Sequence, residues 1–267
     1  MALKRKKKRI LIDKVRIKIG YQKKIYEDAG IKLPASIRSE GSLLLTGATG
    51  TGKSTVLLYI IYEYIFNFGT HGVDIYIADF KRDMPFLYGC ARYFSEVEEI
   101  VSALHSFYLD FQNARKSHSN KVQHIFIIDE YFSLMSLLEI LSKTDKNMKE
   151  IYLRVLMETS AILAMGRSLG YILIVSVQQA SAKSFQSSAD RENFINKISM
   201  GSMSSISASM IFESTDLTGI NFQKPMPIGT GFYHVIGEGA VREFICPQIT
   251  NMDVVQKNIR RFLDKEA

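Results

Sequence analysis

The chain has 267 residues and is 46% hydrophobic, which is enough apolar material for the core of one large domain or two small ones. Its two cysteines, Cys90 and Cys246, exclude a disulfide framework and indicate a reducing, cytoplasmic compartment. The formal charge is +7 and is unevenly spread, because residues 1–25 hold eleven Lys and Arg against one acid. The rest of the chain is therefore slightly acidic.

The basic run is the first feature along the chain, and its densest part is Lys4, Arg5, Lys6, Lys7, Lys8 and Arg9. Such a run attracts polyanions, whether DNA, RNA or an anionic membrane surface, although a solvated tail without a dedicated partner has the same composition. No later stretch reaches the ~20 apolar residues of a membrane-spanning helix. We therefore expect a cytoplasmic protein that reaches the inner face of a membrane only through a partner protein or this tail. We treat residues 1–40 as a basic N-terminal segment and residues 41–267 as one domain.

The most informative motif follows at residues 47–54, where Gly-Ala-Thr-Gly-Thr-Gly-Lys-Ser matches the P-loop pattern G-x-x-x-x-G-K-[ST] at every fixed position. Residues 42–46 have the pattern of a short buried strand, and residues 55–66 that of a helix whose N-terminus faces the loop. In such a loop the backbone N–H groups and the lysine hold the phosphates of ATP, and the hydroxyl of Ser54 binds Mg²⁺. The predicted ATP contacts are Gly47, Ala48, Thr49, Gly50, Thr51, Gly52, Lys53, Ser54 and Thr55.

Further strands and helices alternate along the chain. Apolar strands are expected at residues 74–79, 124–128 and 171–177, with helices at 96–115 and 148–168 between them. The last third is less regular and ends in a Gly-x-Gly turn into a strand at residues 229–235. Strands that are apolar throughout and separated by helices indicate an α/β fold, with a mostly parallel central sheet flanked by helices on both faces.

The strand at 124–128 is followed by Asp129 and Glu130, the arrangement of a Walker B motif. Asp129 is expected to hold Mg²⁺ through its water shell, and Glu130 to orient and polarise the water that attacks the γ-phosphate. An acidic pair that only caps a helix is the structural alternative. Simple kinases need no water-activating carboxylate, so Glu130 favours hydrolysis over phosphoryl transfer to a small molecule.

The strand at 171–177 is followed by Gln178, whose amide is expected to sense the γ-phosphate and pass that information on. A surface amide is the default for an isolated Gln after a strand. Here the order of the motifs, with one strand inserted between the P-loop and the Walker B strand, is the pattern of RecA-like P-loop ATPases.

At this point the chain resembles the FtsK/SpoIIIE DNA translocases, within the FtsK–HerA group of P-loop ATPases. The resemblance covers residues 41–246 and lies in segments 47–54, 77–81, 127–130, 166–178 and 229–232, which occur in the order of that family's motifs. It implies a homo-hexameric ring that threads double-stranded DNA and hydrolyses ATP with Mg²⁺ at subunit interfaces. It also implies a cation supplied by the neighbouring subunit, for which Arg167 is our first candidate and Arg191 our second. The chain departs from the family where Gln179 and Ala180 replace the usual Arg-Pro, and where Lys197 stands in a segment that tends to carry arginines.

Small relatives of this family serve as coupling ATPases in conjugation and mobile-element maintenance, which would imply a membrane-bound or relaxosome partner. Others package the genomes of membrane-containing viruses. Two readings of a different class stay open: an adapter that binds nucleotide without translocating, and a small-molecule kinase, which Glu130 and the missing basic lid after the Walker B strand disfavour.

Overall fold

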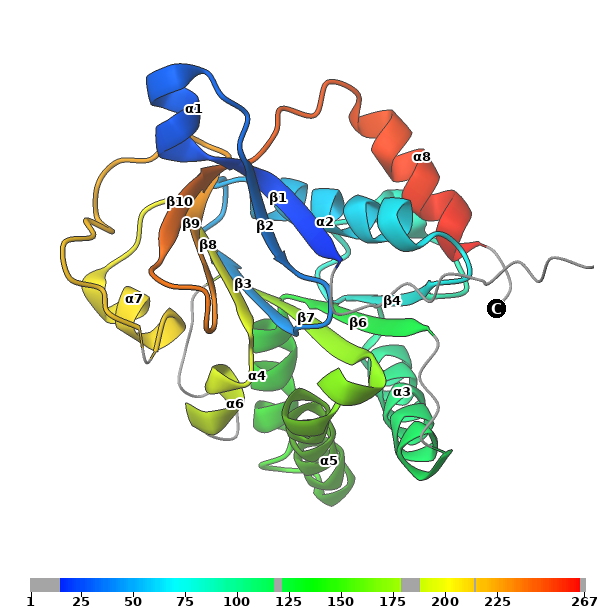
Figure 1. Cartoon of the computed structure of the whole chain (residues 1–267). Helices are drawn as coiled ribbons and strands as arrows, with labels where there is room; N and C mark the ends of the chain where they lie inside the picture. The colour runs from blue at the N-terminus through cyan, green and yellow to red at the C-terminus, as the bar shows by residue number, and fades with distance from the viewer. Residues whose placement is uncertain (1–14, 118–121, 179–187, 214, 265–267) are drawn as a thin grey trace, which may run out of the picture.

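The computed structural model describes residues 15–117, 122–178, 188–213 and 215–264. They form one sheet with the strand order β2-β1-β10-β9-β8-β3-β7-β6-β4-β5 (Figure 1). The block from β8 to β5 is parallel, and β2, β1, β10 and β9 extend it with antiparallel pairs. The strands are β1 (Arg16–Gln22), β2 (Pro34–Arg38), β3 (Leu43–Gly47), β4 (Val73–Asp79), β5 (Tyr93–Phe94), β6 (Gln123–Asp129), β7 (Tyr171–Val177), β8 (Asn196–Met200), β9 (Thr230–Val235) and β10 (Arg242–Ile245).

Helices cover both faces of this sheet (Figure 1). Helices α2 (Lys53–Phe68) and α8 (Met252–Leu263) share one apolar core with the sheet, and α3 (Val97–Ser117), α4 (Tyr131–Leu141) and α5 (Lys146–Met165) share the other. The shorter helices are α1 (Lys23–Ala29), α6 (Ser188–Glu192), α7 (Ser205–Ile211) and the 3-10 turns η2 (Pro85–Leu87) and η3 (Arg167–Leu169). The expected α/β fold with a mostly parallel, two-sided sheet is confirmed.

The central strands are apolar throughout because both of their faces are covered. Every residue of β3 and of β7 is buried, which an antiparallel strand with one wet face would not allow. Strands β4, β6, β7 and β9 lie within one or two residues of the ranges expected from the sequence. No described helix is both long and apolar enough to span a membrane.

Two parts of the region assigned from the sequence to the basic N-terminal segment, residues 16–22 and 34–38, are strands of the sheet. Strand β1 pairs with β2 and with β10, and its Ile17 and Ile19 are fully buried. The charged residues of β1 alternate with these isoleucines, so one face of the strand meets the core and the other faces outward. The basic composition of this region therefore did not indicate the two strands that it contains.

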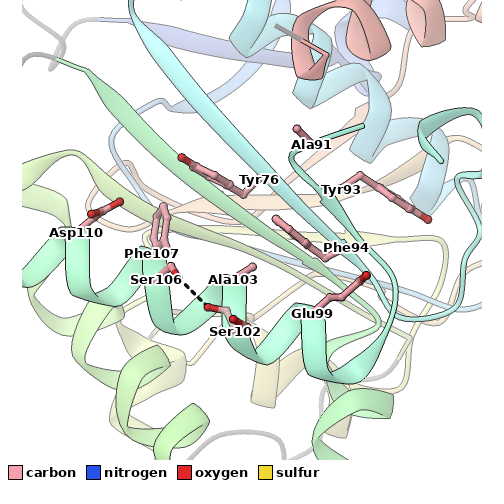
Figure 2. A pocket seen from close by; sticks show the side chains of 10 residues that line it. All are labelled: Tyr76, Ala91, Tyr93, Phe94, Glu99, Ser102, Ala103, Ser106, Phe107 and Asp110. Carbon is pink, nitrogen blue, oxygen red and sulfur yellow. Dashed lines mark hydrogen bonds between the residues drawn. The ribbon is translucent and has the colours of Figure 1, made fainter. Parts of the chain in front are cut away.

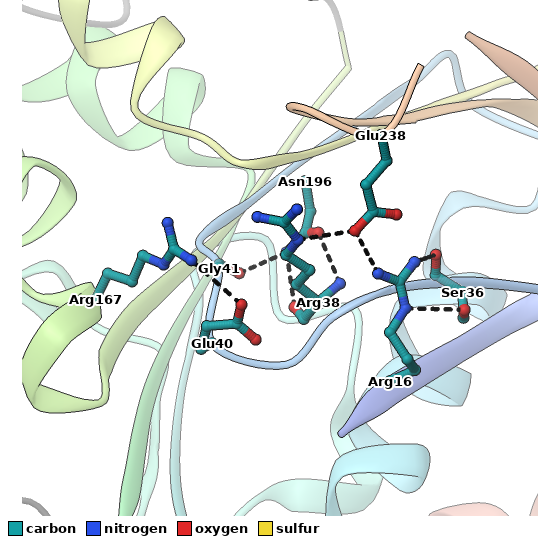
Figure 3. A network of polar contacts seen from close by, with 8 residues as sticks. All are labelled: Arg16, Ser36, Arg38, Glu40, Gly41, Arg167, Asn196 and Glu238. Atoms are coloured by element: carbon teal, nitrogen blue, oxygen red, sulfur yellow. Dashed lines mark hydrogen bonds and ion pairs between the residues drawn. The ribbon is translucent and has the colours of Figure 1, made fainter. Parts of the chain in front are cut away.

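Asn196, the first residue of β8, joins three segments at the amino edge of the parallel strands (Figure 3). Its side-chain oxygen accepts a hydrogen bond from the backbone N–H of Arg38 at 2.9 Å. Its amide nitrogen donates to the backbone carbonyls of Arg38 at 2.9 Å and Gly41 at 2.7 Å. Because Asn196 is fully buried, water cannot replace these bonds, and the side chain fixes the β2–β3 turn against β8.

Replacing this amide should therefore destabilise the fold. We expect Asn196→Ala to lower the free energy of unfolding by about 1–3 kcal/mol, because three buried hydrogen bonds to the backbone are lost. Urea denaturation monitored by circular dichroism measures this change. Asn67→Ala is the matched control, since Asn67 is exposed and bonds only within α2. Equal midpoints for the two variants would show that Asn196 is not a structural tie.

Candidate active site

The loop between β3 and α2 has the conformation that its glycines permit. Gly50 and Gly52 have φ angles of 83° and 94°, in the left-handed region that residues with a side chain rarely adopt. A Cβ atom on Gly47 would lie 2.8 Å from the Cβ of Met200, so glycine is also required there for space. Helix α2 begins at Lys53, and its free N–H groups face the loop. The loop therefore offers backbone donors at the positive end of a helix, as an anion site requires.

Lys53 reaches from the start of α2 to the end of β6. Its ammonium group donates to the carboxylate of Glu130 at 2.7 Å and to the hydroxyl of Ser176 at 2.8 Å, and it lies 3.4 Å from Asp129. The side chains of Lys53 and of both acids are at most 8% exposed. The structure thus brings together the predicted lysine and both predicted carboxylates, and adds Ser176 from the otherwise apolar strand β7.

Glu130 is held from two sides. Its second oxygen lies 3.1 Å from the ammonium group of Lys81, which follows β4. Burial raises the pKa of the Glu130 carboxyl, but hydrogen bonds and charges from Lys53 and Lys81 outweigh that effect, so the pKa lies below its usual value. Glu130 has a φ of 57°, a left-handed conformation that is uncommon outside glycine. This turn directs its side chain back toward the P-loop rather than along α4.

The position of Lys81 is fixed by the turn that contains it. Asp79, the fully buried last residue of β4, accepts hydrogen bonds from the backbone N–H groups of Asp83 and Met84 at 3.1 and 2.8 Å and from the Tyr93 hydroxyl at 2.9 Å. This segment is part of the resemblance to the translocase family, but the sequence analysis did not predict Lys81 as a site residue. The signal was available, because a lysine just after a parallel strand lies at the same edge as the Walker B acids.

Gln178 lies at the exposed end of β7, as predicted for a sensor. It lines a cavity of about 250 Å³ together with Gly47 and a group of small polar side chains from β8 and the start of α7. The cavity is continuous with the P-loop through Gly47 and Ala48. The amide therefore shares a cavity with the first residues of the P-loop, and its sensor role stays a prediction.

The predicted Mg²⁺ ligands suit that ion. Ser54 is exposed beside the P-loop, and the buried carboxylate of Asp129 ends β6 at the same edge of the sheet. A hydroxyl and a carboxylate are hard oxygen ligands of the kind that Mg²⁺ prefers, with water and phosphate completing its shell. When bound, the ion would neutralise charge on the phosphates of ATP.

The turn at Gly229 contacts the P-loop, and the sequence analysis did not assign it to the site. Its N–H donates to the carbonyl of Thr51 at 3.0 Å, and its own carbonyl accepts from the N–H of Cys246 at 2.7 Å. A Cβ on Gly52 would lie 3.2 Å from the Gly229 nitrogen. The Gly-x-Gly turn quoted for the resemblance therefore supports the P-loop from the C-terminal part of the sheet.

The two candidate arginines do not lie at this site in their own chain. Arg167 precedes β7, a strand that spans about 20 Å, so it sits at the opposite edge from Gln178. There it lies 3.4 Å from Glu40 and is half exposed (Figure 3). Arg191, on α6, is largely buried and pairs with Glu213 at 2.6 Å. The basic residues Lys4 to Arg9 lie outside the described part of the chain.

Comparison with solved structures agrees with this fold. The pCW3 conjugation coupling protein TcpA, in a monomer form with ATPγS, superposes with a TM-score of 0.66 at 18% identity, over 94% of this chain and 75% of that one. The cytoplasmic domain of the type VII secretion ATPase EccC of Thermomonospora curvata gives 0.63 at 18% identity, over 92% and 31%. The genome-packaging NTPase B204 of Sulfolobus turreted icosahedral virus 2, with AMPPCP, gives 0.51 at 11% identity, over 79% and 100%.

At these identities the likeness establishes the fold of a P-loop ATPase. The chain spans three quarters of the conjugation protein's chain and less than a third of the secretion ATPase's. No protein-family model and no curated protein sequence matches the chain.

The buried contact between Lys53 and Glu130 should be measurable as a coupling in stability. In a double-mutant cycle with Lys53→Met and Glu130→Gln we expect an interaction free energy of about 1–3 kcal/mol in nucleotide-free protein, because both charges are desolvated. Urea denaturation of the four proteins measures it. The cycle of Lys81→Met with Glu130→Gln is the comparison and should give less, since Lys81 is one-third exposed. A larger coupling for Lys81 than for Lys53 would contradict this geometry.

Proposed function

We propose that this chain is an ATP-hydrolysing DNA translocase that works as a homo-hexameric ring motor in conjugative transfer or maintenance of a mobile element. The observation that carries the ATPase part is the Lys53–Glu130 contact of 2.7 Å. It supports a P-loop lysine and a water-activating carboxylate at one catalytic centre.

The hydrolytic step follows from this arrangement. The phosphates of ATP lie against the P-loop N–H groups and draw the ammonium group of Lys53 away from Glu130. The freed carboxylate oxygen accepts a hydrogen bond from a water molecule and orients it for in-line attack on the γ-phosphorus. The bond between the γ-phosphorus and the bridging oxygen breaks, and ADP and phosphate are the products. Gln178 lies beside this phosphate and responds to its loss.

DNA as the substrate is supported by charge. The chain's excess of positive charge lies in residues 1–25, and backbone phosphates are contacted by Lys and Arg without regard to sequence. The conjugation coupling protein and the viral packaging NTPase share the fold and are named for processes that move DNA or a genome. Packaging of a viral genome is the second candidate, favoured by an alignment that covers the whole of the packaging NTPase.

A ring is supported by the placement of Arg167. It is half exposed at the edge of the sheet opposite the P-loop, where it cannot serve the site of its own chain. In a ring, the exposed edge of one subunit faces the nucleotide site of the next, and Arg167 would act there on the γ-phosphate. Arg191 is the weaker candidate because it is largely buried and lies 2.6 Å from Glu213, whereas Arg167 is half exposed and its contact with Glu40 is longer, at 3.4 Å.

Steady-state ATP hydrolysis, with and without long duplex DNA, tests this function. We expect duplex DNA to stimulate the wild type, Lys53→Ala to lose tight ATP binding, and Glu130→Gln to bind ATP but to hydrolyse it at least about 100-fold more slowly. Glu130→Gln should bind ATP at least as tightly as wild type, because Lys53 loses its nearest anionic competitor. Rapid turnover by Glu130→Gln would remove Glu130 from the chemistry. A rate that ignores duplex DNA, single-stranded DNA and RNA would favour the adapter.

The basic run should set the salt dependence of DNA binding. Deleting residues 1–9 should weaken binding and reduce the slope of log K against log salt by up to about 0.9 for each cation lost. Arg5→Lys with Arg9→Lys keeps the charge and is expected to keep the slope. Binding by fluorescence anisotropy between about 50 and 200 mM salt measures both variants. An unchanged slope after the deletion would show that these residues do not contact DNA.

A further inference from the structure

A groove with an aromatic floor runs between α3 and the β4–β5 edge of the sheet (Figure 2). Its volume is about 520 Å³. Tyr76 of β4, Phe94 of β5 and Phe107 of α3 line it, and the rings of Tyr76 and Phe107 meet edge to face at 5.9 Å. Because β5 is the last strand of the sheet, no described strand covers this edge.

The rim of the groove is acidic. Glu99 and Asp110 lie on the same side of α3, near the two ends of the groove, with Ser102 and Ser106 between them (Figure 2). Both carboxylates are exposed, and neither forms an ion pair among the described residues. The two acids are eleven positions apart on α3, which corresponds to about 16 Å along the helix axis. The nearby cation Arg92 lies 3.6 Å from Asp74, so its charge is already balanced. Apolar floor and anionic rim together select a segment that carries both cations and apolar side chains.

The chain itself has such a segment. Residues 4–12 read Lys-Arg-Lys-Lys-Lys-Arg-Ile-Leu-Ile, six cations followed by three aliphatic residues. We propose that this segment binds in the groove of its own chain, with its cations paired to Glu99 and Asp110 and its apolar side chains on the aromatic floor.

The point where the described chain begins makes this reachable. The carbonyl of Val15 accepts a hydrogen bond from the N–H of Ser39 at 3.3 Å, and the Ser39 carbonyl accepts one from the side chain of Gln123. Gln123 is the first residue of β6, the neighbour of β4, so Val15 lies at the amino edge close to the groove. Extended chain carries Ile12 up to about 10 Å and Lys4 up to about 36 Å from Val15, and the 16 Å groove takes about five extended residues.

Binding in the groove has a consequence that rests on the proposed function. The same cations are expected to contact DNA, so the acidic groove and the phosphates compete for them. In the absence of DNA the groove holds the segment, and duplex DNA displaces it. The docking step itself does not depend on ATP or DNA.

Fluorescence quenching in the full chain tests the docking. The sequence has no tryptophan, so Phe94→Trp places a single one in the groove. Lys7→Cys carries a bimane group, which tryptophan quenches at contact range. Burial raises the pKa of Cys90 to about 11 and of Cys246 to about 12, which favours labelling of residue 7 at neutral pH. Phe66→Trp is the matched control, because Phe66 is 74% exposed on α2, across the sheet from the groove.

We expect roughly twofold quenching with Phe94→Trp at about 50 mM salt, since a tethered segment needs only weak ion pairs to be half bound. It should be lost at about 500 mM salt and in Glu99→Lys with Asp110→Lys, and absent with Phe66→Trp. Glu139→Lys with Glu150→Lys, a partly exposed acid on α4 and an exposed acid on α5, should leave it unchanged.

Three results would overturn the proposal: no quenching with Phe94→Trp, quenching that survives the reversal of Glu99 and Asp110, or quenching only between labelled and tryptophan-bearing molecules in a mixture. Urea midpoints of the variants check that each is folded. Adding duplex DNA then tests the competition separately. Quenching that stays while DNA is bound would contradict displacement, and quenching without any DNA binding would sink the proposed function but not the docking.

Discussion

The hydrogen-bonded ion pair between Lys53 and Glu130 is the interaction on which the site depends. Lys53 follows β3 and Glu130 follows β6, and β7 lies between these two strands. The lysine side chain therefore crosses the end of β7, where it donates a hydrogen bond to the Ser176 hydroxyl. Parallel strands make this possible because their carboxyl ends share one edge. A buried charge without a partner would lower the free energy of unfolding. The lysine and the carboxylates therefore stabilise this edge of the sheet only when they are paired with one another.

The same contact places the Glu130 carboxylate between two cations. Lys53 contacts one of its oxygens and Lys81 contacts the other. In the proposed function, a phosphate of ATP competes with Glu130 for Lys53, and its binding frees one oxygen of Glu130 for water. On that proposal, nucleotide binding and activation of the carboxylate are one event. Lys81 stays behind as its remaining cationic partner, on a turn fixed by Asp79.

Sequence reasoning predicted the parts of the site whose spacing is local. The P-loop, the Walker B pair and Gln178 each follow a strand, so a pattern of a few residues places them. Gly229 was missed as a site residue because its contact with Thr51 joins segments far apart in sequence. Lys81 was missed although it follows β4 as closely as the Walker B pair follows β6, because no motif marks a lysine at that position. Strand β1 was missed because Arg16 and Lys18 alternate with its buried isoleucines, and the composition suggested a solvated arm. Strand β2 was missed because it is short and begins at Pro34. Helix α8 follows an irregular stretch and was not predicted, although Val255, Ile259 and Phe262 have the i, i+4, i+7 spacing of the apolar face that packs in the core beside α2.

The candidate nucleotide site and the start of the described chain lie at opposite edges of the parallel strands. The site lies at the carboxyl edge, whereas Val15 lies at the amino edge, next to Ser39. Any effect of DNA on hydrolysis must then cross the length of the strands. Strand β8 is suited to carry it, since Asn196 ties its first residue to the β2–β3 turn and Met200, at its other end, packs on Gly47 of the P-loop. A displacement of the turn would move both ends of this short, fully buried strand together, because a packed core transmits strain rather than absorbing it.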